Sequence, residues 1–388
     1  MGIIQLQETD ASVKKVKDRQ YYIDNLRIFL TILVVLHHLA ITYGAPGGWY
    51  YVEGTPGKIE SLFLTMFVAS NQAFFMGMFF MISAYFMIPS LLRNEMISFL
   101  RDRIFRLGIP ILLFFFVLSP ITLFALNKLK YDMPFGFGEF LQTKEAFGFG
   151  PLWFVEALLI FTILFLVFIK VTGYSLKKPV DINPVSNAKI LFLGIFMGLS
   201  SMIVRIWIPI GWTLEPFSFQ IAHFPQYITL FIIGVLAYQK NWIASITFQQ
   251  GRMWFIVAQV LIILIIPGIF IFGGVEETGS EPFLGGFTWQ FIIYSFWEQI
   301  VCVALIVGLI GIFKKKLNFQ GKIAKSLSGT AYAVYVFHTP IVVITTLYIQ
   351  SWNINLFLKF IILSPFVVFL CFGMGGLVKQ IPWLRKVF

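Results

Sequence analysis

The residues of this sequence best suited to chemistry lie on one apolar stretch: an arginine and two adjacent histidines. Residues 21–43 carry Asp24 and Arg27 near their start and His37 and His38 near their end, with no glycine or proline between. Each residue of an α-helix turns by about 100° and rises about 1.5 Å, so Arg27 and His38 lie within about 20° of one face and roughly 16 Å apart. An imidazole suits proton transfer near neutral pH. Because His37 points about 100° away, His38 is the favoured reactive group.

A second cationic group lies in the segment RNEMISFLRDRIFRLGIP, residues 93–110. Arg103 and Arg106 are one helical turn apart, and guanidinium groups bind phosphate through paired hydrogen bonds. This pair therefore predicts a site for a ligand with several phosphates. Arg93 and Arg101 are interpreted as ordinary cytoplasmic anchors of a membrane helix.

Ionisable residues also occur inside other apolar segments: Glu156, Arg205, Glu298 and His338. Such residues are costly in a membrane and usually face a bundle interior or a cavity. Glu156 is expected about 6 Å below the outer end of its segment and His38 about 8 Å below its own, so the two could share a level. A structural ion pair of Arg205 with Glu298 or Glu156 is the alternative interpretation. His223 lies in an external loop and is given no role.

The composition indicates a membrane protein. The 388 residues are 58% hydrophobic and 12% charged, and the mean hydropathy is +0.84. A soluble protein would leave too much of this apolar surface in water. The net charge of +11 does not indicate nucleic acid as a partner, because the basic residues alternate loop by loop. Cys302 and Cys371 lie in apolar runs and are interpreted as packed thiols, and no clustered ligand set predicts a metal.

Ten apolar segments predict an all-α fold, a polytopic membrane bundle of about ten helices. The segments are 27–43, 70–90, 104–126, 152–170, 190–210, 224–239, 253–272, 289–313, 330–349 and 356–378. Most have the roughly 17–25 residues that cross a bilayer. Residues 61–72, before the second segment, are expected to lie in the interface or to re-enter. Pro110 and Pro120 interrupt the third, which a bundle tolerates where neighbouring groups satisfy the freed carbonyls.

The lysines and arginines predict the orientation. Short loops rich in these residues stay cytoplasmic, and most of the 29 fall on one side if the N-terminus is inside. The exceptions are Lys58, Lys128, Lys130, Lys144, Arg205 and Lys359. Both termini are therefore predicted to be cytoplasmic. The predicted division is an N-terminal tail at 1–20, a membrane domain at 21–380 and a C-terminal tail at 381–388.

Aromatic residues gather near the predicted outer surface: Trp49, Tyr50, Tyr51 and Trp153. An interfacial aromatic belt is the preferred interpretation. Stacking on sugar rings is a second one, and nothing in the sequence separates the two.

Several motifs, in this order, resemble the acyltransferase 3 family of bacterial integral membrane acyltransferases. Arg27 followed by His38 is similar to the family's first span, and FFMISAYFM (79–87) is similar to its FxxSG motif with Ala84 at the glycine position. The matches continue with Arg103, Arg106 and Pro110, with GPLWFVEALL (150–159), and with AYAVYVFHTPIV (331–342), which contains His338 and Pro340. The GPLWFVEALL element also resembles the subgroup that contains the glucan-modifying succinyltransferases.

The resemblance implies transfer of an acyl group, acetyl or succinyl, from cytoplasmic acyl-CoA to a hydroxyl of an external or lipid-linked carbohydrate. It implies a bacterial cytoplasmic membrane as the location. The phosphates of the donor, acyl-CoA, would be bound by Arg27, Arg103 and Arg106. The predicted catalytic residues are His38, Glu156 and His338, with His38 as general base or as acyl acceptor.

Two other functions compete with this one. The first is a transporter or flippase for a lipid-linked saccharide, with Glu156, Arg205, Glu298 and His338 as a proton relay. Neither the internal repeats nor the paired broken helices typical of transporters are evident. The second is a catalytically silent partner in polysaccharide synthesis, against which the Arg27 and His38 pair speaks. The sequence does not identify which acyl group is transferred or which molecule accepts it.

Overall fold

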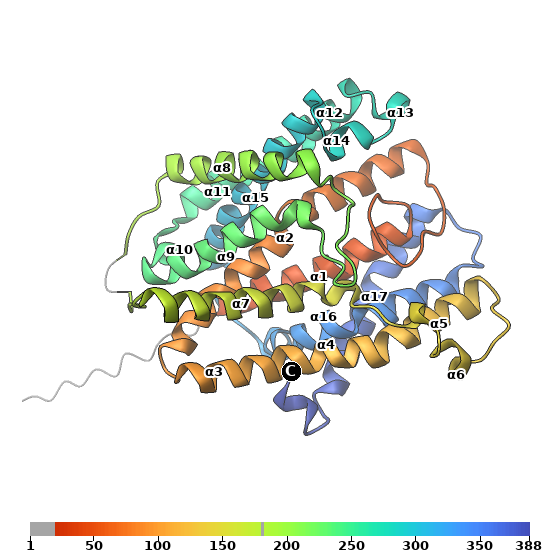
Figure 1. Ribbon diagram of the computed structural model, residues 1–388. Coiled ribbons are helices and arrows are strands. Elements are labelled where there is room, and N and C mark those ends of the chain that lie inside the picture. Colours follow the sequence, from red (N-terminus) through yellow and green to blue (C-terminus); the bar gives the residue numbers. More distant parts are fainter. Residues whose placement is uncertain (1–19, 180–181) are drawn as a thin grey trace, which may run out of the picture.

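The protein is a helical bundle in the computed structural model, which describes residues 20–179 and 182–388 (Figure 1). Within these residues, ten helical segments are long and apolar enough to cross a membrane, and no strand is formed. The predicted all-α, ten-span fold is confirmed. The cytoplasmic location of the termini stays a prediction.

Ten spans are built from longer helices, and four short helices lie in the connections. The spans are α1 (Tyr21–Thr42), α2 (Lys58–Leu91), α3 to α5 (Met96–Arg103, Ile109–Leu113 and Ser119–Lys130), α7 (Trp153–Thr172), α8 (Asn187–Trp207), α9 (Phe224–Gln239), α11 and α12 (Phe248–Val260 and Ile266–Phe272), α15 (Trp289–Lys316), α16 (Lys322–Ile349) and α17 (Leu356–Val378). The short helices are α6 (Phe137–Phe140), α10 (Trp242–Ser245), α13 (Val275–Thr278) and α14 (Glu281–Leu284).

The second span is longer than predicted. Residues 61–72 are not a separate interfacial or re-entrant piece but belong to the continuous helix α2. This stretch has no glycine or proline, and its Leu64 and Val68 pack in a core cluster with residues of α1 and α17. The re-entrant alternative was therefore wrong, because packing continues the helix through the polar positions, and the interfacial position of these residues stays a prediction.

Wide helical turns absorb the prolines of two spans. Three turns have π-helical hydrogen bonding: Ile104–Gly108, Phe114–Leu118 and Leu261–Ile265. Each ends two residues before a proline, namely Pro110, Pro120 and Pro267. Proline has no N–H, so the carbonyl four residues earlier loses its partner, and a wide turn lets that carbonyl reach the next N–H. The helix from α3 to α5 consequently runs without a break.

Glycines allow the helices to approach closely around α15, whose membrane-crossing part is 78% buried. A Cβ on Gly251 of α11 would lie 2.7 Å from the Cα of Gly311 in α15. Ala84 of α2 faces Gly234 of α9, where an added Cβ would lie 2.9 Å from that of Ala84. Helices α2 and α9 therefore approach closely at Ala84, and the small residue that permits this approach is Gly234 of α9.

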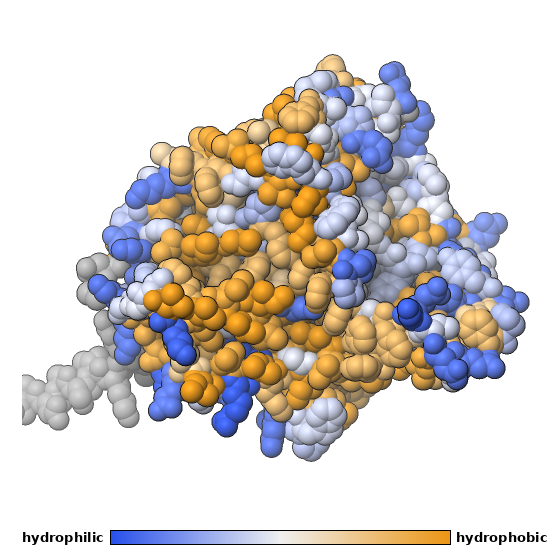
Figure 2. Space-filling view, in the orientation of Figure 1, coloured by the Kyte–Doolittle hydropathy of each residue, from blue (hydrophilic) through white to orange (hydrophobic). Residues whose placement is uncertain are grey.

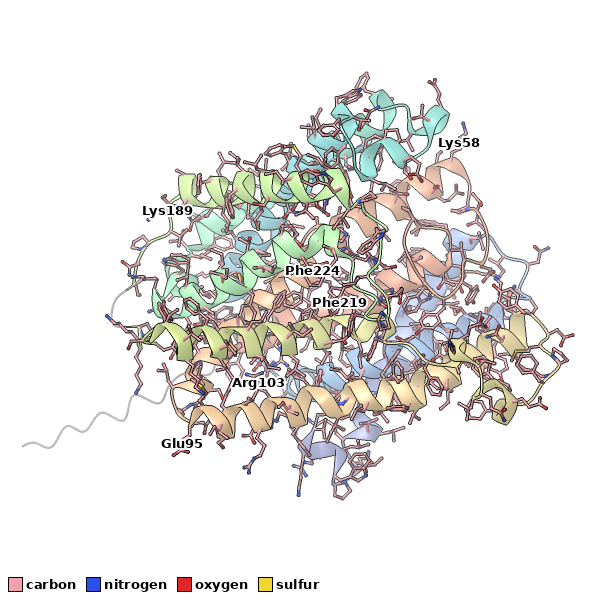
Figure 3. All side chains as sticks on the ribbon, viewed as in Figure 1. Lys58, Glu95, Arg103, Lys189, Phe219 and Phe224 are labelled. Carbon is pink, nitrogen blue, oxygen red and sulfur yellow. The ribbon has the colours of Figure 1, made fainter. Side chains whose placement is uncertain are left out.

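The surface agrees with a membrane protein. Figure 2 shows apolar residues over the sides of the bundle and polar residues gathered at its two ends. Glu95 and Lys189 mark the end at which α1 begins, and Lys58 marks the opposite end (Figure 3). We call the end at which α1 begins the N-terminal end, and we call the opposite end the cavity end, because the large cavity described below opens there.

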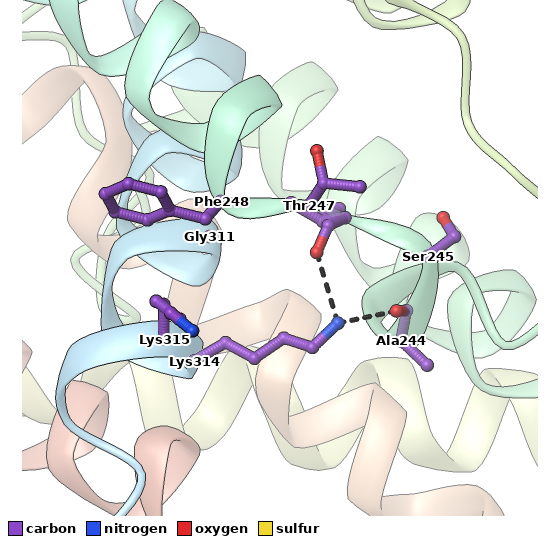
Figure 4. A pocket seen from close by; sticks show the side chains of 8 residues that line it. Ala244, Ser245, Thr247, Phe248, Gly311, Lys314 and Lys315 are labelled. Carbon is purple, nitrogen blue, oxygen red and sulfur yellow. Dashed lines mark hydrogen bonds between the residues drawn. The ribbon is translucent and has the colours of Figure 1, made fainter.

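One lysine side chain, that of Lys314, holds the loop after α10 at the N-terminal end. Lys314 of α15 lies in a small pocket of about 240 Å³ and donates to the carbonyls of Ala244, at 2.5 Å, and Ile246, at 3.1 Å (Figure 4). It therefore satisfies carbonyls that the end of α10 leaves free.

The two predicted tails have different outcomes. Residues 1–19 of the predicted N-terminal tail lie outside the described residues. The C-terminal residues pack onto the bundle, because Leu384 and Val387 are buried and the ring of Phe388 lies 5.5 Å from that of Tyr332 in α16. They are part of the same folded body.

Candidate active site

A large cavity opens at the cavity end of the bundle. Its volume is about 1790 Å³, and its wall combines aromatic rings with polar side chains from α1, α2, α5, α9 and the loops above them. Exposed loop residues 46–48 and Lys58 lie at its rim. Sites for single small molecules usually measure about 300–1,000 Å³. The space therefore suits a larger ligand with both apolar and hydrogen-bonding faces.

Three histidines meet beside this cavity, where His37 and His38 line the wall and His338 is buried behind them. The His38 ring stacks on Trp49, with centroids 3.9 Å apart, and on His338 of α16, at 5.3 Å. His37 meets His38 edge-on at 5.5 Å and contacts Phe75 of α2 at 5.0 Å. Both His37 and His38 line the cavity, although the sequence predicted this for His38 above all. The cavity extends over two sides of α1, which is why an angular offset of about 100° does not exclude His37.

The hydrogen bonds of these histidines define which nitrogen can react. His338 is fully buried, and its Nδ1 lies 2.6 Å from the carbonyl oxygen of Tyr335. A carbonyl only accepts, so Nδ1 carries the proton and Nε2 has a free lone pair. Nδ1 of His38 is buried and receives no hydrogen bond from the described residues. Nε2 is therefore the nitrogen of His38 that a ligand in the cavity can reach.

The loop of residues 43–57, here called the Trp49 loop, holds Trp49 against His38. The Glu53 N–H donates to the Thr42 carbonyl at 2.8 Å, and Lys359 of α17 forms an ion pair with the Glu53 carboxylate at 2.5 Å. Lys130 of α5 donates to the Val52 carbonyl at 3.2 Å. Three elements thus anchor this short loop and fix the indole ring over the imidazole.

Most aromatic residues of the predicted interfacial belt lie instead in the wall of the cavity. Trp49, Tyr50 and Trp153 line the cavity, and Tyr51 packs in a small core cluster with Leu126. Burial raises the pKa of Tyr50, so its hydroxyl stays protonated and able to donate. The belt interpretation is replaced by a cavity wall of aromatic rings.

The three predicted phosphate-binding arginines lie at the other end. Arg27, Arg103 and Arg106 each occupy the first third of their span, and Arg103 is visible near α3 in Figure 3. Arg103 stacks over the Phe99 ring at 5.0 Å, and Arg106 is exposed within the first wide turn. Arg27 lies 3.9 Å from Asp24.

The cavity stops short of these arginines. On α1 its wall runs from Val34 to Ile41 and does not include Arg27. Leu30 and Thr31, on the same face between them, are buried. Val34 is roughly 10 Å along the helix from Arg27. The shared passage expected from the sequence is therefore interrupted by packed side chains in this conformation.

Glu156 is not part of the cavity wall. It lies one turn after Trp153 in α7, half-buried, and among the described residues no hydrogen bond reaches its Oε2. A catalytic role for Glu156 stays a prediction.

Arg205 forms the ion pair that the sequence left open, and its partner is Glu298. Both are almost wholly buried, and Arg205 Nη2 lies 2.5 Å from Glu298 Oε2. His223, which the sequence placed in an external loop without a role, is buried in this group, with Nδ1 3.1 Å from Arg205 Nη2. Its position one residue before FPQ, the start of α9, was the available signal for a packed location.

The groups of the transporter hypothesis do not form one relay. Arg205 and Glu298 bond to each other, whereas His338 bonds to the Tyr335 carbonyl on another helix. Within the described ranges, no hydrogen bond links Glu156 to either group.

Comparisons with known proteins agree with the family resemblance. A family model described as "Acyltransferase domain" matches residues 20–376. The protein named glucans biosynthesis protein C from Salmonella paratyphi B is 24% identical over 384 residues, which cover 95% of this chain and 94% of that protein. Its namesake from Escherichia coli O157:H7 is 23% identical over 379 residues, with the same coverage. No solved structure matches. Because the family model covers nearly the whole chain, this multi-pass membrane protein belongs to the acyltransferase 3 family.

Proposed function

We propose that this protein is an O-acyltransferase that moves an acetyl or succinyl group from cytoplasmic acyl-CoA to a hydroxyl of a glucan or another external or lipid-linked carbohydrate. The family supports acyl transfer, and the name of the similar proteins supports a glucan as acceptor. The large cavity with an aromatic and polar wall suits a sugar chain. The proposed location is the bacterial cytoplasmic membrane, with both termini cytoplasmic and the cavity facing outward.

The observation that carries the proposal is the position of His38 in the cavity wall. Its ring stacks on both Trp49 and His338, which also lie 6.2 Å from each other, and its only reachable nitrogen is Nε2. A fixed imidazole beside a space for the acceptor is what general-base catalysis of acyl transfer requires.

The chemical step follows from this arrangement. His38 Nε2 takes the proton of the acceptor hydroxyl while its oxygen attacks the thioester carbonyl carbon. The new C–O bond forms, the C–S bond breaks, and the imidazolium returns its proton to the departing thiolate of coenzyme A. We assign stabilisation of the negative charge on the carbonyl oxygen to the Tyr50 hydroxyl, because Tyr50 lines the cavity, its ring lies 5.0 Å from that of Trp49, and it stays protonated.

The donor approaches from the N-terminal end. Arg27, Arg103 and Arg106 bind the phosphates of coenzyme A there, and the thin pantetheine arm follows the face of α1 toward His38. Leu30 and Thr31 occupy that route, so donor binding has to part them.

One assay tests the proposal. Purified protein in detergent is given radiolabelled acetyl-CoA or succinyl-CoA with and without a glucan oligosaccharide, and both free thiol and labelled oligosaccharide are measured. We expect thiol release that depends on the acceptor, with label in the sugar. Label that stays on the protein when the acceptor is omitted, and that is lost in His38→Ala, would identify His38 as an acyl carrier instead of a base. No labelled sugar with either donor would contradict the proposed function.

Arg103 offers a test of the donor site. A charged hydrogen bond to phosphate contributes about 1.5–3 kcal/mol, so Arg103→Ala should raise KM for acyl-CoA by about 10- to 100-fold with KM for the acceptor unchanged. Arg101→Ala, on the same helix but exposed, is the matched control and should stay near wild type. Equal effects of the two substitutions would show that Arg103 does not bind the donor.

Trp49 offers a test of how the imidazole is held. Ring contacts of this kind contribute about 0.5–1.5 kcal/mol, so Trp49→Ala should lower kcat by up to about tenfold, while Trp49→Phe keeps most of it. Donor KM should not move. An alanine variant with wild-type kcat would show that the stack on His38 has no catalytic consequence.

A further inference from the structure

A fourth histidine, His223, faces the cavity apart from the cluster of His37, His38 and His338. His223, Tyr227 and Trp153 all line the cavity, and their rings form a row with centroids 6.1 Å and 5.4 Å apart. Gln72 of α2 donates to the Tyr227 hydroxyl at 3.3 Å. The row comes from α7 and the start of α9, whereas His38 and His338 come from α1 and α16. The rings are stacked on one another, with interplanar angles of 29° and 25°, and the row brings polar atoms to this part of the cavity wall.

The contacts of His223 define its tautomer. Arg205 Nη2 lies 3.1 Å from His223 Nδ1, and a guanidinium only donates. Glu298 Oε1 lies farther from the same nitrogen, at 3.5 Å, so the closer guanidinium contact assigns Nδ1 as the acceptor of the neutral ring and places the proton on Nε2. No hydrogen bond from the described residues reaches Nε2, although the side chain is only 2% exposed. His223 thus offers an N–H donor at the cavity wall, in contrast to the free lone pair of His338.

The surrounding network prevents His223 from turning away. Arg205 Nε donates to the carbonyl of Ala222, the preceding residue, at 3.1 Å. Glu298 binds Arg205 and also accepts from Gln299 at 2.9 Å. Gln226, in the first turn of α9, donates to Gln299 Oε1 at 2.9 Å. The main chain and the ring are thus fixed together, so the donor is preorganised before any ligand binds.

We propose that His223 is the hydrogen-bond donor of an acceptor subsite, in which a sugar unit lies along the row of Trp153, Tyr227 and His223 and one of its hydroxyl oxygens accepts from His223 Nε2. This inference rests on the proposed function, because it takes the acceptor to be a carbohydrate. It separates binding from chemistry: His38 acts on the reacting hydroxyl, and His223 selects the sugar that brings it. Arg205 and Glu298 are positioning residues that act through His223.

The test compares His223→Phe with wild type. Phenylalanine keeps the ring beside Tyr227 but removes the donor. We expect KM for a glucan oligosaccharide to rise by about tenfold, with KM for acyl-CoA and kcat at saturating acceptor unchanged. His223→Gln, which can donate from a similar position, should recover part of the loss. Thermal unfolding in detergent is measured in parallel, because a purely structural role would lower stability and change all kinetic constants together.

Acceptor analogues sharpen the result. A series of glucan oligosaccharides, each lacking one hydroxyl, is assayed with both proteins. One analogue should be a poorer acceptor than the parent for wild type by about the same tenfold, and the variant should no longer distinguish that analogue from the parent. Discrimination that persists in His223→Phe, or an unchanged acceptor KM in an active enzyme, would overturn the subsite.

The two levels of the proposal fail differently. A wild-type protein that transfers no acyl group contradicts the proposed function. In that event, a binding titration with the oligosaccharide, monitored by the fluorescence of the cavity tryptophans, still tests the acceptor subsite. Weaker binding to His223→Phe than to wild type supports the subsite, and equal binding overturns it.

Discussion

The His38→Ala variant is expected to lose acyl transfer by a factor of about 10²–10⁴, because general-base catalysis contributes about that much. The loss should appear in kcat with little change in KM for acyl-CoA, since the predicted phosphate contacts lie at the other end of the bundle. Acceptor-dependent thiol release by purified protein measures it, and gel filtration in detergent shows that the variant is folded.

His37→Ala is the matched control for this substitution. His37 is the adjacent residue, also buried and also in the cavity wall, but its ring contacts Phe75, whereas the ring of His38 stacks on Trp49 and on His338. We expect the His37 variant to be weakened and not inactive. If both variants lose activity equally, the assignment of the base to His38 is wrong.

Removing one partner of the Arg205 and Glu298 pair should strongly destabilise the protein. A buried charge left without its partner costs about 3–5 kcal/mol, so Arg205→Met or Glu298→Gln alone should lower the free energy of unfolding by about that amount. The double variant Arg205→Met with Glu298→Gln should lose less than the sum of the two single variants, since no charge is then stranded. Denaturant titration in detergent measures all three.

Arg101→Met serves as the comparison for the pair. Arg101 is exposed on α3, and a surface substitution of this kind usually changes stability by less than about 0.5 kcal/mol. Additive losses in the Arg205 and Glu298 double variant would show that the two side chains do not depend on each other, despite the 2.5 Å contact.

The sequence predicted the bundle well because membrane spans are encoded locally. A run of apolar residues is enough to locate a span, and ten such runs correspond to the ten helices. Helix ends were less predictable. The polar positions of residues 61–72 indicated an interfacial or re-entrant piece before the second span. Helix α2 nevertheless continues through them, because Leu64 and Val68 pack against neighbouring helices.

The site was only partly predictable, because its contacts join segments far apart in the chain. Helical spacing selected His38, and its stack on His338 brings together two residues of the predicted site. The same reasoning could not find His223, whose place depends on Arg205 from α8 and Glu298 from α15. Nor could it show that Trp49, on a loop, turns inward and covers the imidazole.

The wide turns in the third span have a consequence for how its length can vary. Such a turn amounts to one extra residue in an otherwise regular helix. Deleting one residue from Phe114–Leu118 would leave an ordinary turn, and the helix beyond it would keep its phase. Deleting one residue from the regular turn Ile109–Leu113 would instead rotate everything beyond it by about 100° and shift it by about 1.5 Å. Ser119 and Leu123, which face the cavity, would then leave its wall. The residue count of this helix is thus constrained by the phase of two side chains as well as by the thickness of the bilayer.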